Sequence, residues 1–425
     1  MRRLVVFALL VLPLAACSQG GTSNLFEQAP SSPGSPLAKA HLDTSALDSL
    51  RVHLAASLAA HISGGHVATT WGAGSAPDVA GPYRPDQPGT DAAALLAAAL
   101  QPAGANPLEP ARVDVAQAAE TGLRTLDGPQ GGAYLLLAAA DGYRSQPDNA
   151  CTGSDPAAAV ACLRTQVSDG LLKAWYATDT RQFFQVGATS TVYRPVEAFA
   201  VGCALLVAGY GEHSSAKITA GMDIVQGEMK ASLDPHYGLV YGLATRTAAG
   251  GFEPTDTVAR LADQAGIAEM LLEAFDLSRE AALREDAQKV LTPLLEGDVG
   301  LHTDGGLVTS IDTRGTAPAA GSPVDIEATL LALQAGAHYD RDAAPRFAGL
   351  EESMARYLAA LATSPLSADG LPGQFTPQGP SAYSGLVTAV GVLVLADVTG
   401  ARPVPLPSLS AVPMPSPLPP VSPSP

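Results

Sequence analysis

The chain has 425 residues, with 41 acidic against 24 basic side chains and a formal net charge of −17 at pH 7. Such an acidic surface repels nucleic acid and anionic lipid headgroups, so DNA or RNA binding is disfavoured. The sequence has no phosphate-binding glycine loop and no Gly-x-Ser-x-Gly elbow, which disfavours nucleotide-driven and serine-hydrolase chemistry. His53, His61 and His66 lack the spacing of a zinc site, so we expect neither a metal nor another cofactor.

The N-terminus resembles a bacterial lipoprotein signal. Arg2 and Arg3 form a basic start, residues 4–12 are apolar, and Leu-Ala-Ala leads to Cys17. The pattern predicts a signal peptide over residues 1–17 and a lipid on Cys17; the alternative is an ordinary secreted protein cut just before this cysteine. Ser18 follows in place of an aspartate, which resembles lipoproteins directed to the outer membrane or cell surface. Removing the signal removes two arginines and shifts the charge from −17 to −19.

The remaining composition divides the chain into three parts. Residues 18–43 are rich in Ser, Gly and Pro and predict a flexible linker, and residues 44–400 are expected to form one domain. Residues 401–425 are Pro-rich and predict a disordered, extended tail. After the signal, no segment has the uninterrupted apolarity of a membrane span, so we expect membrane attachment through the lipid alone.

The cysteines after the anchor fall into two groups. Cys151 and Cys162 bracket a short loop, which in an oxidising compartment predicts a disulfide. Cys203 lies in an apolar helical segment and is expected to be a buried free thiol.

Two kinds of helix alternate along the domain. Amphipathic segments with apolar residues three and four apart predict helices exposed on one side. They cover residues 44–61, 111–126, 156–177, 214–233, 278–295 and 345–361. Each is followed by a helix that is apolar almost all round and is therefore expected to be buried on most sides. These cover residues 91–100, 131–143, 195–210, 257–275, 323–339 and 381–397.

The apolar helices repeat one pattern, shown by LADQAGIAEMLLEAF at residues 261–275. Aligning the repeats places Glu197, Asp263 and Asp325 at equivalent positions, 66 and 62 residues apart. Connections from an outer helix to the next inner helix are long and contain β-type runs such as GLVYGLATR and GLVTSID, which predict small hairpins at one end of the bundle.

Twelve helices in six hairpins, with apolar helices inside, resemble the six-hairpin (α/α)6 toroid of the glycosidase-like superfamily. The expected fold class is therefore all-α, with small β-hairpins in the long outer-to-inner loops. The resemblance implies that acid/base carboxylates lie near the mouth, where the inner helices begin. Asp263 and Asp325 are the predicted catalytic pair, with Glu197 and Asp256 in reserve. Glu327 is expected to face a neighbouring helix.

Acidic residues in a first helical turn also cap free N–H groups, and structural capping is the competing interpretation for each of these carboxylates. The predicted substrate-binding residues lie in the mouth-side loops and first turns. They are Tyr241, His302, Asp304, Tyr383, Arg194 and Gln130. The loop around His302 is also compatible with a simple polar turn. Four arginines could bind an acidic sugar, but pairing with nearby carboxylates is the alternative; they are Arg194, Arg246, Arg260 and Arg314.

The function expected from this pattern is a lipid-anchored envelope protein that binds and hydrolyses a glycan. A non-catalytic binding or scaffold lipoprotein is the alternative, which the low aromatic content of 5% favours, because sugar rings commonly stack on aromatic side chains. A polysaccharide lyase or epimerase, with Tyr241 or His302 as base, is a third hypothesis.

Overall fold

The computed structural model describes residues 44–63, 66–71, 107–108, 156–296, 305–313, 322–341, 346–362, 369–376, 379–380 and 382–399. Several sequence predictions lie outside these residues. They are the lipid on Cys17, the 18–43 linker, the helices at 91–100, 111–126 and 131–143, the site residues Gln130, His302 and Asp304, the arginine Arg314, the disulfide partner Cys151 and the Pro-rich tail. The backbone of Cys162 lies in a helix, but its side chain is not among the described ones, so the disulfide remains a prediction.

Nine helices are present in the described residues. They are α3 (Ser45–Ala60), α7 (Pro156–Trp175), α8 (Pro195–Glu212), α9 (Ser215–Ser232), α10 (Leu261–Ser278), α11 (Ala281–Leu295), α12 (Ile326–Arg341), α13 (Ala348–Ala362) and α14 (Gly385–Val398). Each matches a predicted helix. Three inner helices begin three or four residues later than predicted, because the preceding residues pair as β-strands.

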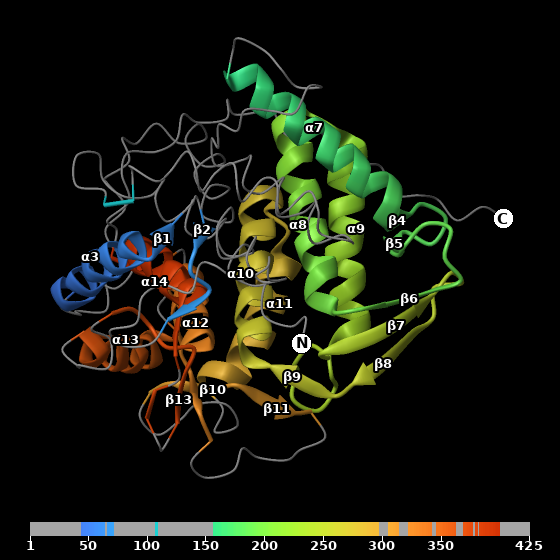
Figure 1. The fold of residues 1–425 in the computed structure, drawn as a ribbon. Coiled ribbons are helices and arrows are strands. Elements are labelled where there is room, and N and C mark those ends of the chain that lie inside the picture. The colour runs from blue at the N-terminus through green and yellow to red at the C-terminus, as the bar shows by residue number, and fades with distance from the viewer. Residues whose placement is uncertain are drawn as a thin grey trace, which may run out of the picture.

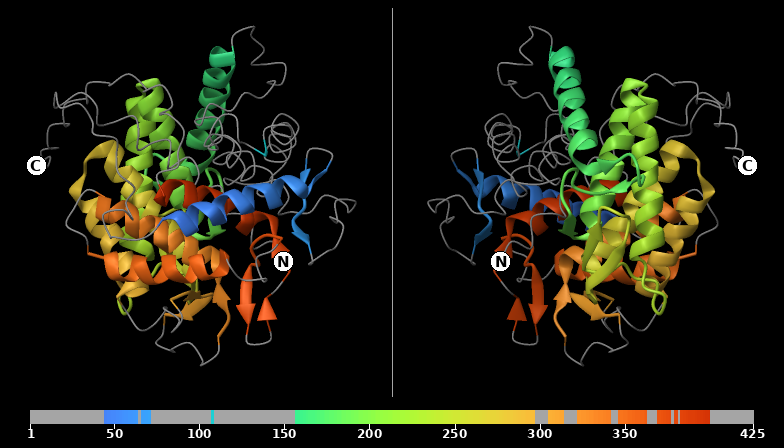
Figure 2. Two further views of the ribbon diagram at one scale, coloured as in Figure 1. Left: turned by 90° about the vertical axis from the view of Figure 1, so that its left-hand side faces the viewer. Right: turned by 90° about the vertical axis from the view of Figure 1, so that its right-hand side faces the viewer.

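The inner and outer roles follow from which faces are apolar. In α12 every residue from Ile326 to Asp340 is buried, whereas α11 buries only one face, through Leu283, Ala287 and residues that follow at helical spacing. The inner helices pack in sequence, α8 on α10, α10 on α12 and α12 on α14. Outside them, α9 packs on α8, α11 on α10, α13 on α12 and α3 on α14 (Figures 1 and 2).

Helices α8 and α9 approach closely because glycines line their contact. A Cβ on Gly221 would lie 2.7 Å from the carbonyl oxygen of Gly202, and one on Gly209 would lie 2.8 Å from the backbone nitrogen of Ile218. Any larger residue would force the helices apart. The turn between them places His213 in the left-handed region, with φ of 58°.

The strands are short and lie in the connections between helices. They are β1 (Ile62–Ser63), β2 (His66–Val67), β3 (Thr70–Trp71), β4 (Tyr176–Ala177), β5 (Gln182–Phe183), β6 (Ser190–Tyr193), β7 (Leu243–Thr247), β8 (Phe252–Asp256), β9 (Val258–Arg260), β10 (Leu307–Val308), β11 (Ser310–Asp312), β12 (Val324–Asp325), β13 (Gln374–Thr376), β14 (Gly379–Pro380) and β15 (Tyr383–Ser384). Hairpins β4–β5, β7–β8 and β13–β14 confirm the small β-hairpins expected in the long loops. The run GLVTSID, which was also expected to form a hairpin, instead forms β10 and β11, which pair with β12 and β9.

Other pairs join one connection to the next, which the sequence did not indicate. Strand β6 pairs with β7, β9 with β11, β12 with β13, and β15 with β3. Strands β6, β9, β12 and β15 each lead directly into an inner helix. The pairings therefore tie together the starts of α8, α10, α12 and α14, at the lower end of the molecule in Figure 1. We call this end the mouth end.

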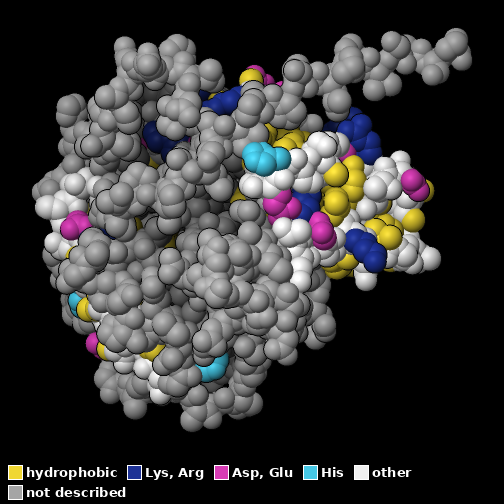
Figure 3. Space-filling view, turned by 90° about the horizontal axis from the view of Figure 1, so that it is seen from above, with side chains coloured by type: hydrophobic (Ala, Val, Ile, Leu, Met, Phe, Trp, Pro, Cys, Tyr) yellow, Lys and Arg dark blue, Asp and Glu magenta, His cyan; other side chains and the backbone are white. Residues whose placement is uncertain are grey.

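One described helix, α8, is long and apolar enough to cross a membrane, with a mean hydropathy of 1.2 over 18 residues. Because 78% of that window is buried within the fold, α8 is a core helix here. Seen from above, exposed side chains of both charge signs lie beside hydrophobic ones on the side that carries α7 and strands β4 to β8 (Figure 3).

Candidate functional site

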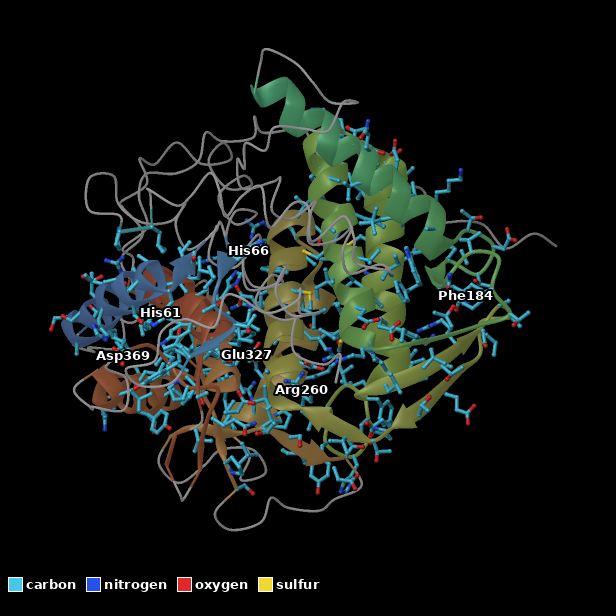
Figure 4. All side chains as sticks on the ribbon, viewed as in Figure 1. His61, His66, Phe184, Arg260, Glu327 and Asp369 are labelled. Atoms are coloured by element: carbon cyan, nitrogen blue, oxygen red, sulfur yellow. The ribbon has the colours of Figure 1, made fainter. Side chains whose placement is uncertain are left out.

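Five charged side chains meet where the inner helices begin, and we call them the mouth cluster: Arg194, Arg260, Asp263, Asp325 and Glu327. The two arginines are the N-cap residues of α8 and α10. Asp325 ends strand β12, and Glu327 is the second residue of α12. Figure 4 shows Arg260 and Glu327 at the lower ends of α10 and α12.

Asp263 forms an ion pair with each of the two arginines. Arg194 donates from Nη2 to Oδ2 of Asp263, and Nη1 of Arg260 lies 3.6 Å from Oδ1. The Asp263 side chain is 5% exposed and that of Arg194 is 15% exposed, so this is a largely buried ion pair. The sequence left open whether these arginines meet a sugar or the nearby carboxylates, and the structure places Arg194 and Arg260 on a carboxylate.

Asp325 acts as the cap of α12. Its Oδ1 accepts a hydrogen bond from the backbone N–H of Ala328 at 3.0 Å, and the side chain is buried. Burial raises the pKa of Asp325, the N–H of Ala328 opposes that rise, and the negative charge of Asp263 adds to it. Asp325 is therefore both a helix cap and a carboxyl of raised pKa, so the structural and the catalytic interpretation are both compatible with this residue.

Glu197 has a capping role too. Its Oε2 accepts the backbone N–H of Arg194 at 3.4 Å and so completes a capping box at the start of α8. This register corrects the predicted alignment of the repeats. Glu197 and Asp263 occupy the third helical position, but Asp325 stands at the N-cap, the position of Arg194 and Arg260. The strand β12 that precedes α12 ends at Asp325, and this shifts the acidic residue by one helical turn.

Glu327 was not among the predicted site residues. It is only 2% exposed, and its Oε1 has no hydrogen-bond partner among the described residues. Burial raises its pKa, and the neighbouring charge of Asp325 raises it further, while Arg260 and Arg194 pull it down. One sequence signal points to it: an acidic residue at the start of a helix that is apolar all round must be neutralised or paired.

The other described candidates lie apart from these contacts. Asp256 is exposed on β8 and its Oδ1 accepts the N–H of Val258 at 2.9 Å, which stabilises the turn between β8 and β9. Burial and Asp234 raise the pKa of Tyr241, which keeps its phenol protonated and so unable to accept a proton as a base. Tyr383 is buried beside Trp71, with ring centroids 6.2 Å apart, near α3 and α14.

A second buried network fixes the strands next to the mouth cluster. Arg246 donates to Glu228 at 2.7 Å, to the hydroxyl of Tyr193 at 3.0 Å and to Gln182 at 3.1 Å. Burial raises the pKa of Glu228 to about 7, although Arg246 and Tyr193 lower it. These bonds join β5, β6 and β7 to α9, and they place Arg246, like Arg194, on a carboxylate.

A third network lies toward the opposite end of the inner helices. Nδ1 of His338 lies 2.9 Å from Oε1 of Glu269, and its Nε2 lies 3.2 Å from Oδ2 of Asp276, which also pairs with Arg341. The two carboxylates raise the pKa of His338 to about 10, against the effect of burial. His338 comes 11 residues after Glu327 on α12, which places it about 16 Å along the helix from the mouth cluster. Within the described ranges, no three His, Cys, Asp or Glu residues are arranged to hold a metal ion.

The comparisons with known proteins agree on the fold. No family model matches the chain, and no curated protein matches it. Solved structures do match, over most of their length and at low identity. An unsaturated glucuronyl hydrolase from Streptococcus agalactiae is 11% identical, with a TM-score of 0.62 over 84% of this chain and 93% of that one.

Two further structures extend the match to other enzymes. D-mannose isomerase is 12% identical, with a TM-score of 0.58 over 85% of this chain and 98% of that one. The GH76A α-1,6-mannanase from Salegentibacter sp. HEL1_6 is 11% identical, with a TM-score of 0.54 over 84% and 99%. The chain therefore has the (α/α)6 toroid fold of these enzymes, as predicted.

Proposed function

We propose that this chain is a lipid-anchored cell-envelope protein that binds a glycan at the mouth end of its toroid and hydrolyses a glycosidic bond there. The observation that carries the proposal is the mouth cluster, in which two carboxyl groups of raised pKa lie beside a paired carboxylate and two arginines.

Hydrolysis of a glycosidic bond needs one carboxyl that is protonated and one that is ionised. Asp325 and Glu327 are two residues apart at the start of one helix, and burial raises the pKa of both, that of Glu327 more. Such a pair holds one proton around neutral pH, which is the state the reaction requires. Asp263 was expected to share the chemistry, but its two arginine partners favour a role in holding the cluster together.

The structural relatives support a glycan as the bound molecule. The names of the three matched structures describe a glucuronyl hydrolase, a mannanase and a mannose isomerase, all of which act on sugars. We extend glycan binding to the present chain because its mouth cluster lies at the starts of the inner helices, where acid/base carboxylates are expected in such toroids.

Reducing-end release tests the activity. The detergent-solubilised wild-type protein is incubated with a panel of envelope and plant polysaccharides, beside the Asp325→Asn variant. Release that is lost in the variant supports the proposal. No release from any polysaccharide by a well-folded protein refutes hydrolysis.

The anchor has a test of its own. The basic start, apolar stretch and Cys17 support lipidation, and no nucleic acid is expected as a partner of so acidic a chain. Metabolic labelling with a radioactive fatty acid should mark the wild type and not a Cys17→Ala variant. Equal labelling of the two refutes the anchor.

A non-catalytic binding protein is the second candidate. It is favoured by the burial of Asp263, Asp325 and Glu327, all at most 4% exposed, and by the neutralisation of Asp263. This function predicts saturable glycan binding in calorimetry with no product, and the affinity should be the same in Asp325→Asn as in the wild type.

A further inference from the structure

Glu327 is one of the groups in the mouth cluster that the described hydrogen bonds leave unsatisfied, and Oδ1 of Asp263 is another. Its side chain is almost fully buried at the second position of α12, and its Oε1 has no hydrogen-bond partner among the described residues. Four charged groups face it: Asp325 at the end of β12, Arg260 and Asp263 at the start of α10, and Arg194 at the start of α8. An ionised carboxylate is costly in a buried site unless hydrogen bonds complete it, so this environment favours the neutral acid.

The carboxyl groups of Asp325 and Glu327 differ in the hydrogen bonds that they accept. Oδ1 of Asp325 accepts the N–H of Ala328 at 3.0 Å, and such a bond stabilises the ionised form. No described donor does this for Oε1 of Glu327. Arg194 and Arg260, whose charges act on Glu327, each form an ion pair with Asp263. A single proton shared by Asp325 and Glu327 therefore resides on Glu327.

We propose that Glu327 is the proton donor to the leaving oxygen of the glycan, with Asp325 as its ionised partner. This inference rests on the proposed function and assigns the acid within it. As the bond between the anomeric carbon and the leaving oxygen breaks, the bonding electrons stay with that oxygen, which takes the proton of Glu327. The water consumed gives its hydroxyl to the anomeric carbon and its remaining proton to the Asp325–Glu327 pair, which restores the starting state.

The chain offers a matched control in Glu351. This residue of α13 is also 2% exposed, has an unpartnered Oε1 among the described residues, and has its pKa raised by burial and by Asp340 to about 8. It lies near the end of α12 that is opposite to the mouth cluster, because Asp340 is close to the last residue of that helix. Glu351→Gln therefore makes the same chemical change away from the cluster.

The first experiment compares two kinds of leaving group. Glu327→Gln should lower kcat about 10²- to 10⁴-fold on a glycan, the range for loss of a general acid. On an aryl glycoside with an acidic phenol the loss should be less than tenfold, because that phenol leaves without a proton. Glu351→Gln should match the wild type on both. Equal losses on both substrates, or none on either, would overturn the proposal.

Should Glu327→Gln not fold, the wild type decides the matter through its pH profile. Cleavage of the glycan should decline at alkaline pH as Glu327 loses its proton, and cleavage of the activated aryl glycoside should not decline there. The same alkaline decline for both substrates would contradict proton donation by this residue.

Infrared difference spectra at pH 7 separate this inference from the proposed function. Both Glu327→Gln and Glu351→Gln should remove a band of a protonated carboxyl. A band that Glu351→Gln removes and Glu327→Gln does not would overturn the assignment of the proton, whatever the activity. Loss of the band in both variants, in a protein that cleaves no glycan, would support the position of the proton and refute hydrolysis.

Discussion

Replacing Asp263 by Asn tests whether the mouth cluster is held together by its ion pairs. The catalytic interpretation drawn from the sequence predicts that this change abolishes turnover with little effect on stability, and as a helix cap the carboxylate would contribute about 0.3–1 kcal/mol. The structure gives a different expectation. Asp263 neutralises Arg194 and Arg260 in a site where its own side chain is only 5% exposed.

The magnitude follows from the buried pair. Removing one partner of a buried ion pair costs about 3–5 kcal/mol, because the other charge remains buried without compensation. The 15% exposure of the Arg194 side chain lets water screen part of that charge, so we expect the lower end, about 3 kcal/mol. That is a large share of the 5–15 kcal/mol that typically stabilises a domain.

Denaturant unfolding followed by circular dichroism measures the effect. Asp286→Asn is the matched control, because it removes the ion pair with Lys289, whose side chain is 57% exposed, and should cost less than about 1 kcal/mol. A loss below about 1 kcal/mol in Asp263→Asn, no larger than in the control, would show that the pair with Arg194 contributes little to stability and would refute the buried-pair argument.

Three further predictions concern stability elsewhere in the fold. The raised pKa of Glu351 means that the folded state keeps its proton up to about pH 8, whereas the unfolded state loses it near 4.5, so wild-type stability falls as pH rises between these two values; Glu351→Gln should unfold at higher urea than wild type at pH 9 and at equal urea at pH 4. The pKa of His338, raised to about 10, gives stability that is present below 6.5 and lost as pH rises through 10, so the destabilisation by His338→Gln should be largest at pH 6 and shrink by pH 10.5 in urea titrations. Gly221→Ala should cost about 1–3 kcal/mol, because the new Cβ would lie 2.7 Å from the carbonyl oxygen of Gly202, whereas Gly227→Ala on the same helix meets nothing within 4 Å and should stabilise by up to about 1 kcal/mol. Melting temperatures of the two glycine variants would settle this, and equal shifts would contradict the close-packing argument.

The helical architecture was predictable because it depends on local patterns. A segment such as α10, apolar on nearly every side, can only be buried, and a segment such as α11, apolar on one face, can only cover it. The alternation of these two kinds predicted paired inner and outer helices, and the resemblance of that pattern to known (α/α)6 toroids implied the closed ring. It also placed the carboxylates at the starts of the inner helices.

Which residues belong to the mouth cluster depends on contacts between segments far apart in the sequence, and local sequence patterns do not predict such contacts. Arg194 and Asp263 are 69 residues apart and meet only because α8 packs on α10. The pairing of β12 with β10 and β13 set the first residue of α12, and this moved Asp325 to a capping position and brought Glu327 into the cluster. The sequence by itself determined which helices are buried and where charges stand along them. Only the tertiary structure decided which charges are neutralised. Neutralisation depends on distances between helices and on the burial of each side chain, and neither quantity can be predicted from a repeating pattern in the sequence.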